Sequence, residues 1–372
     1  MRVSAVAGIV FANVNDNLLK KLTTKRSMAS VPFGSRYRLI DFTLSNLVNA
    51  GITNVGIVTK ENYRSLMDHV GSGVYWDLDR KRGGLYLLPP YSSSGAKRYS
   101  GTVDALNGAR DYIKRCKSDY FVLCDSDLLA NVDISAAIKA HMKNEADITI
   151  VYHKGEVPRN SGETMLIKLN KENRITSVDF NEEGGMESAF GIGITIISRE
   201  LLTSLVGEAT ENDLVSFNKD VIAKKVKQLK ILGFEHSEYV AIMCGTNTYY
   251  SSSMDLLDSE VRRQLFNKER PIYTKTRDDM PTRYGTKAKV NNCLIADGCV
   301  IDGTVKNSIL FRGVKIEKGA VVENCILMQE TSVGAEAQLK NVISDKNGVI
   351  GEKMVLKGTA QKHFFVKKNQ IV

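Results

Sequence analysis

The stretch VPFGSRYRLIDFTLSNLVNAGITNVGIVT, residues 31–59, decides the fold. Its end, from Ile52 to Val58, is almost continuously apolar, which is typical of a strand buried on both faces of a parallel sheet. Gly51 stands directly before this strand and is suited to ending a helix. The apolar residues upstream fall on one side of that short helix: Phe42, Leu44, Leu47 and Val48.

The run Val3–Phe11 is also nearly continuously apolar, and it predicts a first core strand rather than a signal peptide. Together with residues 31–59 it forms a β-α-β unit. The alternation then continues with a helix over residues 105–114, a strand from Asp119, a helix over Ile134–Lys143 and a strand over residues 147–153. This order predicts an α/β fold with a doubly wound, Rossmann-like, mainly parallel sheet, whose ligands bind beyond the carboxyl ends of the strands.

The C-terminal part has a different character. Residues 267–286 are polar and charged and read as a linker. Beyond them, short β-branched segments are punctuated by glycine, and apolar residues recur six apart at Val321, Leu327, Val333 and Leu339. This period predicts a parallel β-helix of hexapeptide repeats, with a small β-sandwich as the alternative. We therefore expect an α/β domain over 1–266, a linker over 267–286 and a β-helix over 287–372.

Composition limits the class of protein. No run of 18 apolar residues exists, so no membrane span is expected. The six cysteines form no CxxC pair, which favours reduced thiols and a cytoplasmic location. The net charge of +9 favours an anionic ligand. Because no nucleic-acid module with interleaved aromatic residues is present, sugar phosphates or nucleotides are expected rather than nucleic acid.

The loop after the first strand is unusual for such a fold. Phosphate-binding loops at this junction need glycine, because backbone N–H groups must approach the anion closely. Here the loop reads Asn13-Val14-Asn15-Asp16-Asn17, with no glycine and an added acid. The architecture is that of a phosphate site, but the loop chemistry is not.

Four motifs carry a resemblance to a known family: residues 22–52, HVGSGVYWDLDRKRGGLYLLPPY (69–91), YSGTVDAL (99–106) and SDLLANVD (126–133). They resemble bacterial glucose-1-phosphate adenylyltransferase, also called ADP-glucose pyrophosphorylase, over nearly the whole chain. The resemblance implies a nucleotidyltransferase domain followed by a left-handed parallel β-helix. It also implies a Mg²⁺-dependent reaction of ATP with glucose 1-phosphate, which gives ADP-glucose and pyrophosphate, and a tetramer controlled by sugar phosphates and nucleotides.

The positions on which the family's phosphate chemistry falls are changed in this chain. Asn15 and Leu18 stand where the family has arginines, and Met28 stands where it has a lysine. Asn13, Val14 and Asp16 replace the loop glycines. The lysine that reads the sugar phosphate corresponds to Asn181.

The metal site is changed as well. Asp127 falls on the family's first metal-binding aspartate, with a structural turn aspartate as the alternative, while Met243 falls on the second. Asp125 could supply another carboxylate. A single carboxylate is a poor Mg²⁺ site, so the metal is expected only if the site is functional.

Two sets of residues keep a binding character. Tyr99, Gly101, Thr102 and Asp104 could hold a nucleotide or a sugar phosphate, or could form a structural turn. Four cations fall on positions that resemble the family's effector site, with a solvated basic face as the alternative. They are Lys25, Arg26, Arg38 and Lys346.

The retained scaffold and the changed site resemble the non-catalytic, regulatory (GlgD-type) subunit found beside a catalytic homologue in some Gram-positive bacteria. This predicts a glycogen-biosynthesis subunit with little or no activity alone, in a hetero-tetramer with a catalytic adenylyltransferase chain, and responsive to a sugar-phosphate or nucleotide effector. Two alternatives stay open: a weakly active adenylyltransferase, and a sugar-phosphate-binding homo-oligomer.

Overall fold

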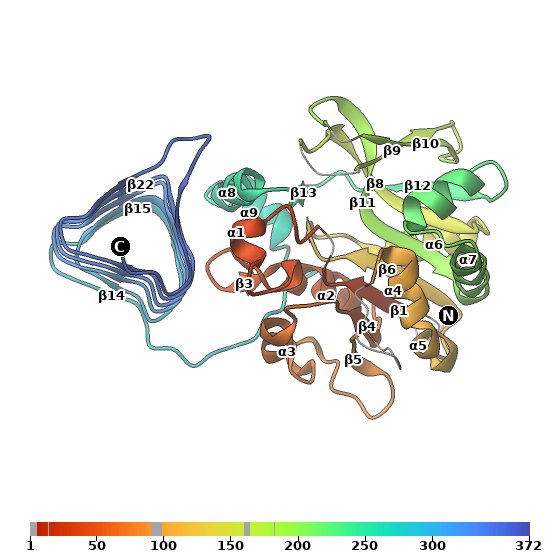
Figure 1. Cartoon of the computed structure of the whole chain (residues 1–372), viewed down its shortest axis with the longest axis horizontal. Helices are drawn as coiled ribbons and strands as arrows, with labels where there is room; N and C mark the ends of the chain where they lie inside the picture. The colour runs from red at the N-terminus through yellow and green to blue at the C-terminus, as the bar shows by residue number, and fades with distance from the viewer. Residues whose placement is uncertain (1–5, 14, 91–98, 160–163, 182) are drawn as a thin grey trace. The chain divides into compact units, whose positions relative to one another are not determined.

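The computed structural model describes residues 6–13, 15–90, 99–159, 164–181 and 183–372. The chain divides into two compact units (Figure 1). The sheet unit consists of residues 1–30, 39–244 and 265–273, and the β-helix unit of residues 31–38, 245–264 and 274–372. These bounds differ from a simple division at 266 and 287, because two segments distant in sequence belong to the β-helix unit. Each unit is described by itself below.

The sheet unit contains a nine-stranded sheet with the order β10-β9-β11-β6-β1-β4-β5, in which β8 pairs with β11 and β12 pairs with β8. Strands β1, β4, β5 and β6 are parallel to one another, whereas β11 runs antiparallel to β6, β8 and β9. The strands are β1 (Val6–Phe11), β4 (Asn54–Val58), β5 (Gly84–Leu88), β6 (Tyr120–Asp125), β8 (Ile148–Glu156), β9 (Thr164–Leu169), β10 (Ile175–Asn181), β11 (Glu187–Ser198) and β12 (Ile231–Glu235).

The helices of this unit follow the sequence pattern, with one exception. The predicted helix over Ile134–Lys143 is confirmed as α6, and Gly51 follows α2 with a positive φ of 77°. The predicted helix over 105–114 is instead two helices, which meet at Ala109. The helices of this unit that matter for the argument are α2 (Leu39–Asn49), α3 (Arg64–Val70), α4 (Thr102–Gly108), α5 (Arg110–Arg115), α6 (Ile134–Lys143) and α7 (Arg199–Glu211).

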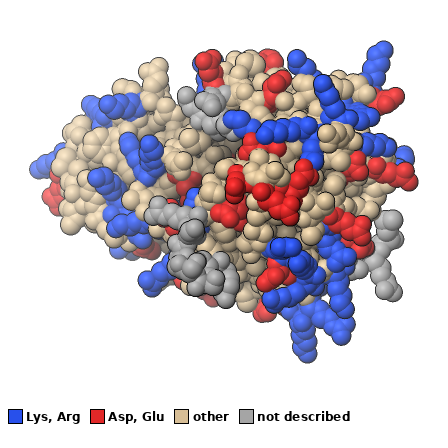
Figure 2. Space-filling model, turned by 45° about the vertical axis from the view of Figure 1, so that its right-hand side comes forward, with Lys and Arg blue, Asp and Glu red and all other residues tan. Residues whose placement is uncertain are grey.

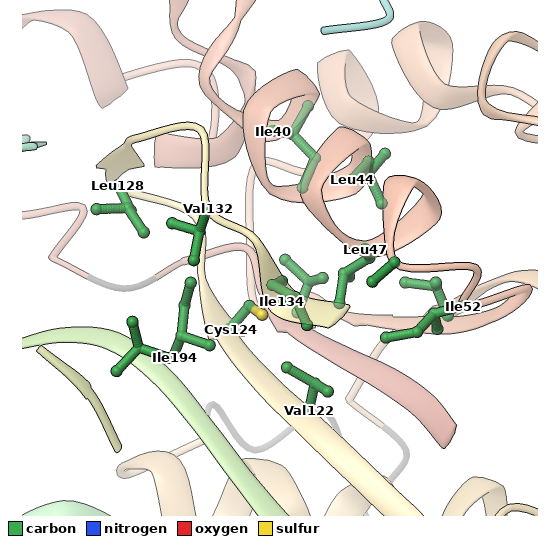
Figure 3. Packing of buried hydrophobic residues seen from close by; sticks show 14 of the residues in the cluster. Ile40, Leu44, Leu47, Ile52, Val122, Cys124, Leu128, Val132, Ile134 and Ile194 are labelled. Carbon is green, nitrogen blue, oxygen red and sulfur yellow. The ribbon is translucent and has the colours of Figure 1, made fainter. Parts of the chain in front are cut away.

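Helices cover both faces of the sheet. Strand β1 shows why the sequence requires this, because its alternate side chains enter two separate cores. Val6 and Val10 belong to the cluster that contains Leu47 of α2, while Ile9 belongs to the cluster that contains Leu106 of α4. Figure 3 shows the first cluster, with side chains of α2 packed over those of β6 and β11. The doubly wound arrangement predicted from the apolar runs is therefore confirmed.

The β-helix unit consists of stacked coils in which every described strand pair from β14 (Arg283–Tyr284) to the C-terminus is parallel. One inward column is Val305, Val322, Leu339 and Leu356, whose members pair in register between successive coils. The strands are β15 (Lys289–Ile295), β16 (Val300–Ile301), β17 (Thr304–Leu310), β18 (Lys315–Ile316), β19 (Val321–Glu323), β20 (Ile326–Leu327), β21 (Ser332–Val333), β22 (Gln338–Lys340), β23 (Val342–Ser344), β24 (Val349–Ile350), β25 (Val355–Lys357) and β26 (Phe364–Val366).

One residue of the six-apart series does not face the interior of the coil. Val321 is 41% exposed, and its neighbour Val322 is fully buried and fills the inward position. Leu327, Val333 and Leu339 of the same series are buried, as expected. The β-helix prediction itself is confirmed. The segment predicted as a linker contains β14, which pairs with β16 and so forms part of the first coil. The remaining elements of this unit are β2 (Pro32–Phe33), β3 (Tyr37–Arg38), α8 (Thr246–Asp255) and α9 (Ser259–Leu265).

The charged side chains are distributed over the surface, and the cysteines are unpaired. On the face shown in Figure 2, Lys and Arg side chains alternate with Asp and Glu rather than forming one continuous basic stripe. All six cysteines are free thiols. Within the part of the chain that the structure describes, no helix is both long and apolar enough to cross a membrane.

Candidate functional site

The candidate site lies where β1 and β6 end. These strands are parallel, and Phe11 at the end of β1 pairs with Asp125 at the end of β6. The loop that follows β1 and the aspartates that follow β6 are therefore brought together, as expected for this class of sheet. Asn15 Nδ2 donates a hydrogen bond to Asp127 Oδ2 at 2.8 Å. Asn15 and Asp127, selected separately from the sequence, are thus in direct contact.

The loop keeps its bend without glycine. Asn15 has a φ of 57°, in the left-handed region that glycine adopts freely and asparagine tolerates better than most residues. Asn13 ties the loop to the chain after β4: its Oδ1 accepts from Lys60 N at 2.8 Å, and its Nδ2 donates to Glu61 O at 3.1 Å. Side-chain amides therefore fix the path of the loop.

Asp16 is bound by the loop itself. Its carboxylate accepts hydrogen bonds from Asn13 Nδ2 at 2.6 Å and from the main-chain N–H of Met28 at 2.7 Å. Its main-chain oxygen accepts from Thr23 Oγ1 at 2.6 Å. Burial raises the pKa of Asp16, although these hydrogen bonds oppose the shift. The N–H group of Met28, the position of a lysine in the family, thus serves an internal carboxylate.

Asp125 is the last residue of β6, and Asp127 follows two positions later. Burial raises the pKa of Asp127 to about 6, against the opposing effect of the hydrogen bond from Asn15. Burial, and then the charge of Asp127, hold the pKa of Asp125 well above its usual range. Two carboxyls in this relation do not both ionise readily near neutral pH. Asp125 therefore holds its proton more firmly than Asp127 at neutral pH.

Met243 lies at the position where the family's second metal aspartate falls. Its main-chain N–H donates to Asp127 O at 2.8 Å, next to the pairing of β13 (Ala241–Ile242) with β7 (Leu128–Leu129). Met243, matched to that aspartate from the sequence motif, thus lies beside Asp127 through its main chain. The side chain, however, is a fully buried thioether, which is a soft ligand unsuited to Mg²⁺.

The site offers few carboxylate oxygens to a Mg²⁺ ion. In phosphate-transfer sites this ion is usually held by one or two carboxylates together with waters and substrate phosphates. Asp127 is engaged by Asn15, and Asp16 by Asn13 and Met28. Across the described residues there is no group of three or more His, Cys, Asp or Glu side chains placed to hold a metal ion. No step of a reaction is therefore assigned to a metal here.

The cavity beside Asp125 and Asp127 is small. It has a volume of about 80 Å³, and a second cavity of about 30 Å³, lined in part by Thr102 and Asp125, adjoins it. Gly193 closes on Asp125, since a Cβ at this glycine would stand 2.6 Å from Asp125 Oδ2. Sites for small molecules usually enclose about 300–1,000 Å³. In this conformation the cavity does not hold a nucleoside triphosphate and a sugar phosphate together.

The other changed positions have local roles. Asn181, at the end of β10, accepts a hydrogen bond from Gly184 N at 2.7 Å through its Oδ1 and so shapes a turn. Leu18 is half-buried, and its main-chain N–H donates to Asn15 O at 2.9 Å. Neither residue lines the two small cavities. Val14 lies outside the described residues.

The predicted nucleotide pocket is occupied mainly by contacts within the chain. Thr102 Oγ1 accepts from Phe217 N at 2.8 Å, and a Cβ at Gly101 would stand 2.3 Å from the carbonyl oxygen of Val215. Asp104 accepts from Ser100 N at 3.1 Å. Tyr99 packs against Gly108, where a Cβ would approach its hydroxyl to 2.4 Å. Thr102 also lines the smaller of the two cavities beside Asp125.

The four predicted effector cations belong to both units. In the sheet unit, Lys25 is exposed and Arg26 is buried at 3% exposure. In the β-helix unit, Arg38 lies in β3 and is half-buried, and Lys346 follows β23 and is half-buried. The effector site stays a prediction.

Sequence reasoning missed three contributors. Asn13 was read only as a lost glycine, Gly193 was not considered, and Asn218 lines both small cavities. Local sequence patterns give no signal for them, because their contacts join segments more than 40 residues apart in the chain. Asn13 reaches Lys60, and Gly193 meets Asp125. Gly193 and Asp125 are brought together by the pairing of β11 with β6.

Comparison with known proteins agrees with this architecture. Residues 17–183 match the nucleotidyl transferase family, and residues 279–372 match the GlmU-like C-terminal hexapeptide family. The fold and these matches define a protein of the nucleotidyltransferase class that carries a hexapeptide β-helix. The second match begins a few residues before β14, in agreement with the first coil of the structure.

Full-length relatives identify the family. The chain is 34% identical over 364 residues to the "Glycogen biosynthesis protein GlgD" of Bacillus subtilis, covering 98% of this chain and 96% of that protein. It is 38% identical over 365 residues, with the same coverage, to the GlgD protein of Geobacillus stearothermophilus. It is 32% identical over 353 residues to a "Glucose-1-phosphate adenylyltransferase" of Bacillus thuringiensis, covering 94% and 92%. The chain belongs to the family that comprises these GlgD proteins and glucose-1-phosphate adenylyltransferases, which confirms the resemblance drawn from its motifs.

Proposed function

We propose that this chain is a regulatory subunit of glucose-1-phosphate adenylyltransferase in glycogen biosynthesis. It has little or no activity alone. It acts in the cytoplasm as part of a hetero-tetramer with a catalytic chain. The GlgD relatives support the pathway. The observation that carries the loss of activity is the capture of Asp16 by Asn13 and Met28, because a carboxylate then stands where the reaction needs groups that bind phosphate.

The chemistry makes this observation decisive. A sugar-phosphate oxygen attacks the α-phosphorus of ATP, and the developing negative charge must be met by cations and N–H donors. Here an acid lies in the loop, Leu18 and Asn181 replace cations, and Met243 replaces a metal ligand. Removal of one such stabilising group lowers a rate by about 10²–10³. Several losses in one site leave no measurable turnover at ordinary enzyme concentrations.

The retained scaffold then serves a partner and its control. We include in this proposal an anion effector site at Lys25, Arg26, Arg38 and Lys346, and a role for Tyr99, Gly101, Thr102 and Asp104 in a nucleotide or sugar-phosphate pocket. Mg²⁺ enters the complex through the catalytic chain. The tight hydrogen bonding around Asp104 and Thr102 also supports a structural role for that segment.

The test is an assay of ADP-glucose synthesis by this chain alone, by a catalytic homologue alone and by the mixture. We expect no turnover from the chain alone and a mixture that exceeds the homologue or changes its response to sugar phosphates. Size-exclusion chromatography with light scattering then gives the composition of the complex. A chain that neither associates with the homologue nor changes its activity contradicts the proposal.

A matched mixture separates the two roles of the subunits. The homologue is first inactivated by replacing its metal-binding aspartates and is then mixed with this chain. We expect this mixture to be inert, because the chemistry belongs to the homologue. Turnover in the inactivated mixture supports instead the alternative in which this chain is itself a weakly active adenylyltransferase through Asp127 and Asp125.

A further inference from the structure

The chain that leads into β14 (Figure 1) includes a short segment of the β-helix unit, residues 277–280, which we call the strap. The main-chain oxygen of Met280 accepts a hydrogen bond from Gly298 N at 2.6 Å. Asp279 lies near the same turn, since a Cβ at Gly298 would stand 3.8 Å from Asp279 Cβ. The strap therefore brings a carboxylate to one corner of the β-helix.

The Asp279 carboxylate lies between two arginines without a hydrogen bond to either. Its Oδ2 is 3.5 Å from Arg312 Nε and 3.6 Å from Arg277 Nε. Charge-assisted hydrogen bonds between such groups are shorter, at about 2.7–2.9 Å. Among the described residues, neither this oxygen nor Nε and Nη2 of Arg312 has a hydrogen-bond partner, although all three atoms are buried. Three strong polar atoms are thus left unsatisfied at one place.

Arg312 is the centre of this cluster. It is only 5% exposed, and buried charged groups normally have hydrogen-bond partners. Burial, and then the charge of Arg36, lower the pKa of Arg312, while Asp279 opposes the shift. Arg277 lowers this pKa further, and Asp297 raises it. These three arginines and two aspartates carry a net charge of +1, so the aspartates do not neutralise the cluster.

A phosphate group fits this place better than the carboxylate of the strap. A phosphate monoester carries a charge of about −1.5 to −2 at neutral pH and has three acceptor oxygens. Arginine pairs with phosphate through two parallel N–H bonds. When the Asp279 carboxylate leaves, the four remaining groups carry a net charge of +2, which matches a dianion.

We propose that Arg312 and Arg277 form a binding site for a phosphate group, and that Asp279 occupies this site as an internal anion until phosphate displaces it. The phosphate is free or part of a monoester, because the site as described selects only the dianion. None of the four predicted effector cations belongs to this pair. The inference does not depend on whether the chain is a regulatory subunit, because all its residues lie in the β-helix unit.

The test is calorimetric titration of the full chain, without a partner and at constant ionic strength, with inorganic phosphate and with glycerol 3-phosphate. We expect Asp279→Ala to bind phosphate at least tenfold more tightly than the parent, because no internal anion then has to be displaced. Asp278→Ala removes the same charge from the exposed neighbouring residue and should change the affinity less than twofold. Equal gains from the two variants, or no binding of either probe to Asp279→Ala, overturn the proposal.

Arginine variants locate the binding, and they are made in the Asp279→Ala chain. Arg277→Ala, at a side chain 51% exposed, should weaken phosphate binding about tenfold, and Arg312→Lys, which keeps the charge but loses the planar fork, should weaken it by a similar factor. Lys315→Ala, at an exposed position of β18, is the control and should leave binding unchanged. If binding instead falls on replacing Lys25 and Lys346 and is insensitive to both arginine variants, the proposal is wrong.

Hydrogen exchange tests the displacement of Asp279 separately. Loss of its ion pairs should loosen the strap, so phosphate should speed exchange of the Gly298 amide, which donates to Met280 O. The Asp279→Ala variant should show this faster exchange without phosphate. Phosphate that binds the parent and slows exchange at Gly298 would show that Asp279 stays in place, which contradicts its role as an internal anion.

Discussion

Strand β1 and the loop that follows it stand next to each other in sequence but follow different rules. The strand is apolar throughout and supplies side chains to both cores, so its composition is dictated by packing. The loop, residues 13–18, is held by polar contacts from Asn13, Asn15 and Asp16 that are internal to the chain. Two neighbouring segments of one chain can therefore be fixed by different forces, the strand by apolar packing and the loop by hydrogen bonds within the chain.

The largest expected effect is a loss of folding stability when the packing around strand β1 is disrupted. Leu47 of α2 is fully buried and packs against β1, where a Cβ at Gly8 would lie 3.0 Å from its Cδ1. We expect Leu47→Ala to lower the free energy of unfolding by about 2–5 kcal/mol, because it leaves a cavity in a close-packed core. Urea denaturation followed by circular dichroism measures this.

The matched control is Leu18→Ala in the loop, since Leu18 is half-buried and lines neither small cavity. This change should lower the free energy of unfolding by at most about 1 kcal/mol, in proportion to the smaller apolar area it buries. Equal losses from the two leucines would mean that the loop belongs to the core, and the comparison would fail.

The second prediction concerns Asp16. Asp16→Ala removes the acceptor of the Met28 N–H and of Asn13 Nδ2, and a buried donor without an acceptor costs about 1–3 kcal/mol. We expect a loss of stability in that range in urea denaturation. Asp16→Asn keeps one acceptor oxygen for Met28 and should lose less. If Asp16→Ala unfolds at the same urea concentration as the parent, the carboxylate does not hold the loop.

How far the sequence alone leads can be judged from particular elements. Strand β1, α2 and α6 are predictable, because each shows a regular apolar pattern that local residues determine. The break at Ala109 was missed, because the helical pattern continues across it; the break accompanies the packing of Gly108 against Tyr99. Helix propensity alone does not register a contact of that kind.

The β-helix shows a second limit. Inward residues of successive coils, such as Val305, Val322 and Leu339, stand 17 apart, as their pairing shows. A strict six-residue period gives 18, so a series counted back from Leu339 in steps of six reaches the exposed Val321 and not the buried Val322. The site was harder still: which residues are changed can be read from the sequence, but the capture of Asp16 joins residues 13, 16 and 28 and needs the fold.

The third prediction uses the pH dependence of stability. Burial raises the folded-state pKa of Asp127 to about 6, above the ordinary aspartate value of 3.8, so the folded protein holds an extra proton between these values. Stability therefore falls as pH rises from about 4 to 6, and the burial of Asp127 is a net cost at pH 7. Asp127→Asn keeps an acceptor for Asn15 and should raise the free energy of unfolding at pH 7 by about 1–2 kcal/mol.

His141 of α6 serves as the comparison for this pH effect on stability. Its pKa is lowered to about 4 by burial, so its contribution has the opposite sign: stability is lost as pH falls from 6.5 to 4. The gain from Asp127→Asn should vanish near pH 4, and the loss due to His141 should be greatest there. Urea titrations at pH 4, 5.5 and 7 separate the two. A gain from Asp127→Asn that does not vary with pH would show that burial of charge is not its cause.

The smallest expected effect is on catalysis. Leu18→Arg together with Asn181→Lys places cations at two half-buried positions. If the loop has become structure, these cations face a site whose N–H donor is taken by Asp16 and whose second metal position is a buried thioether, so no ADP-glucose synthesis should appear. A double variant that turns over on the order of once per second or faster, the lower end of ordinary enzyme rates, would show a working site that lacked only charge. That result would favour the alternative in which this chain is a weakly active adenylyltransferase. It would also mean that the Asp16 carboxylate does not block the loop, because turnover needs the loop to accept a phosphate.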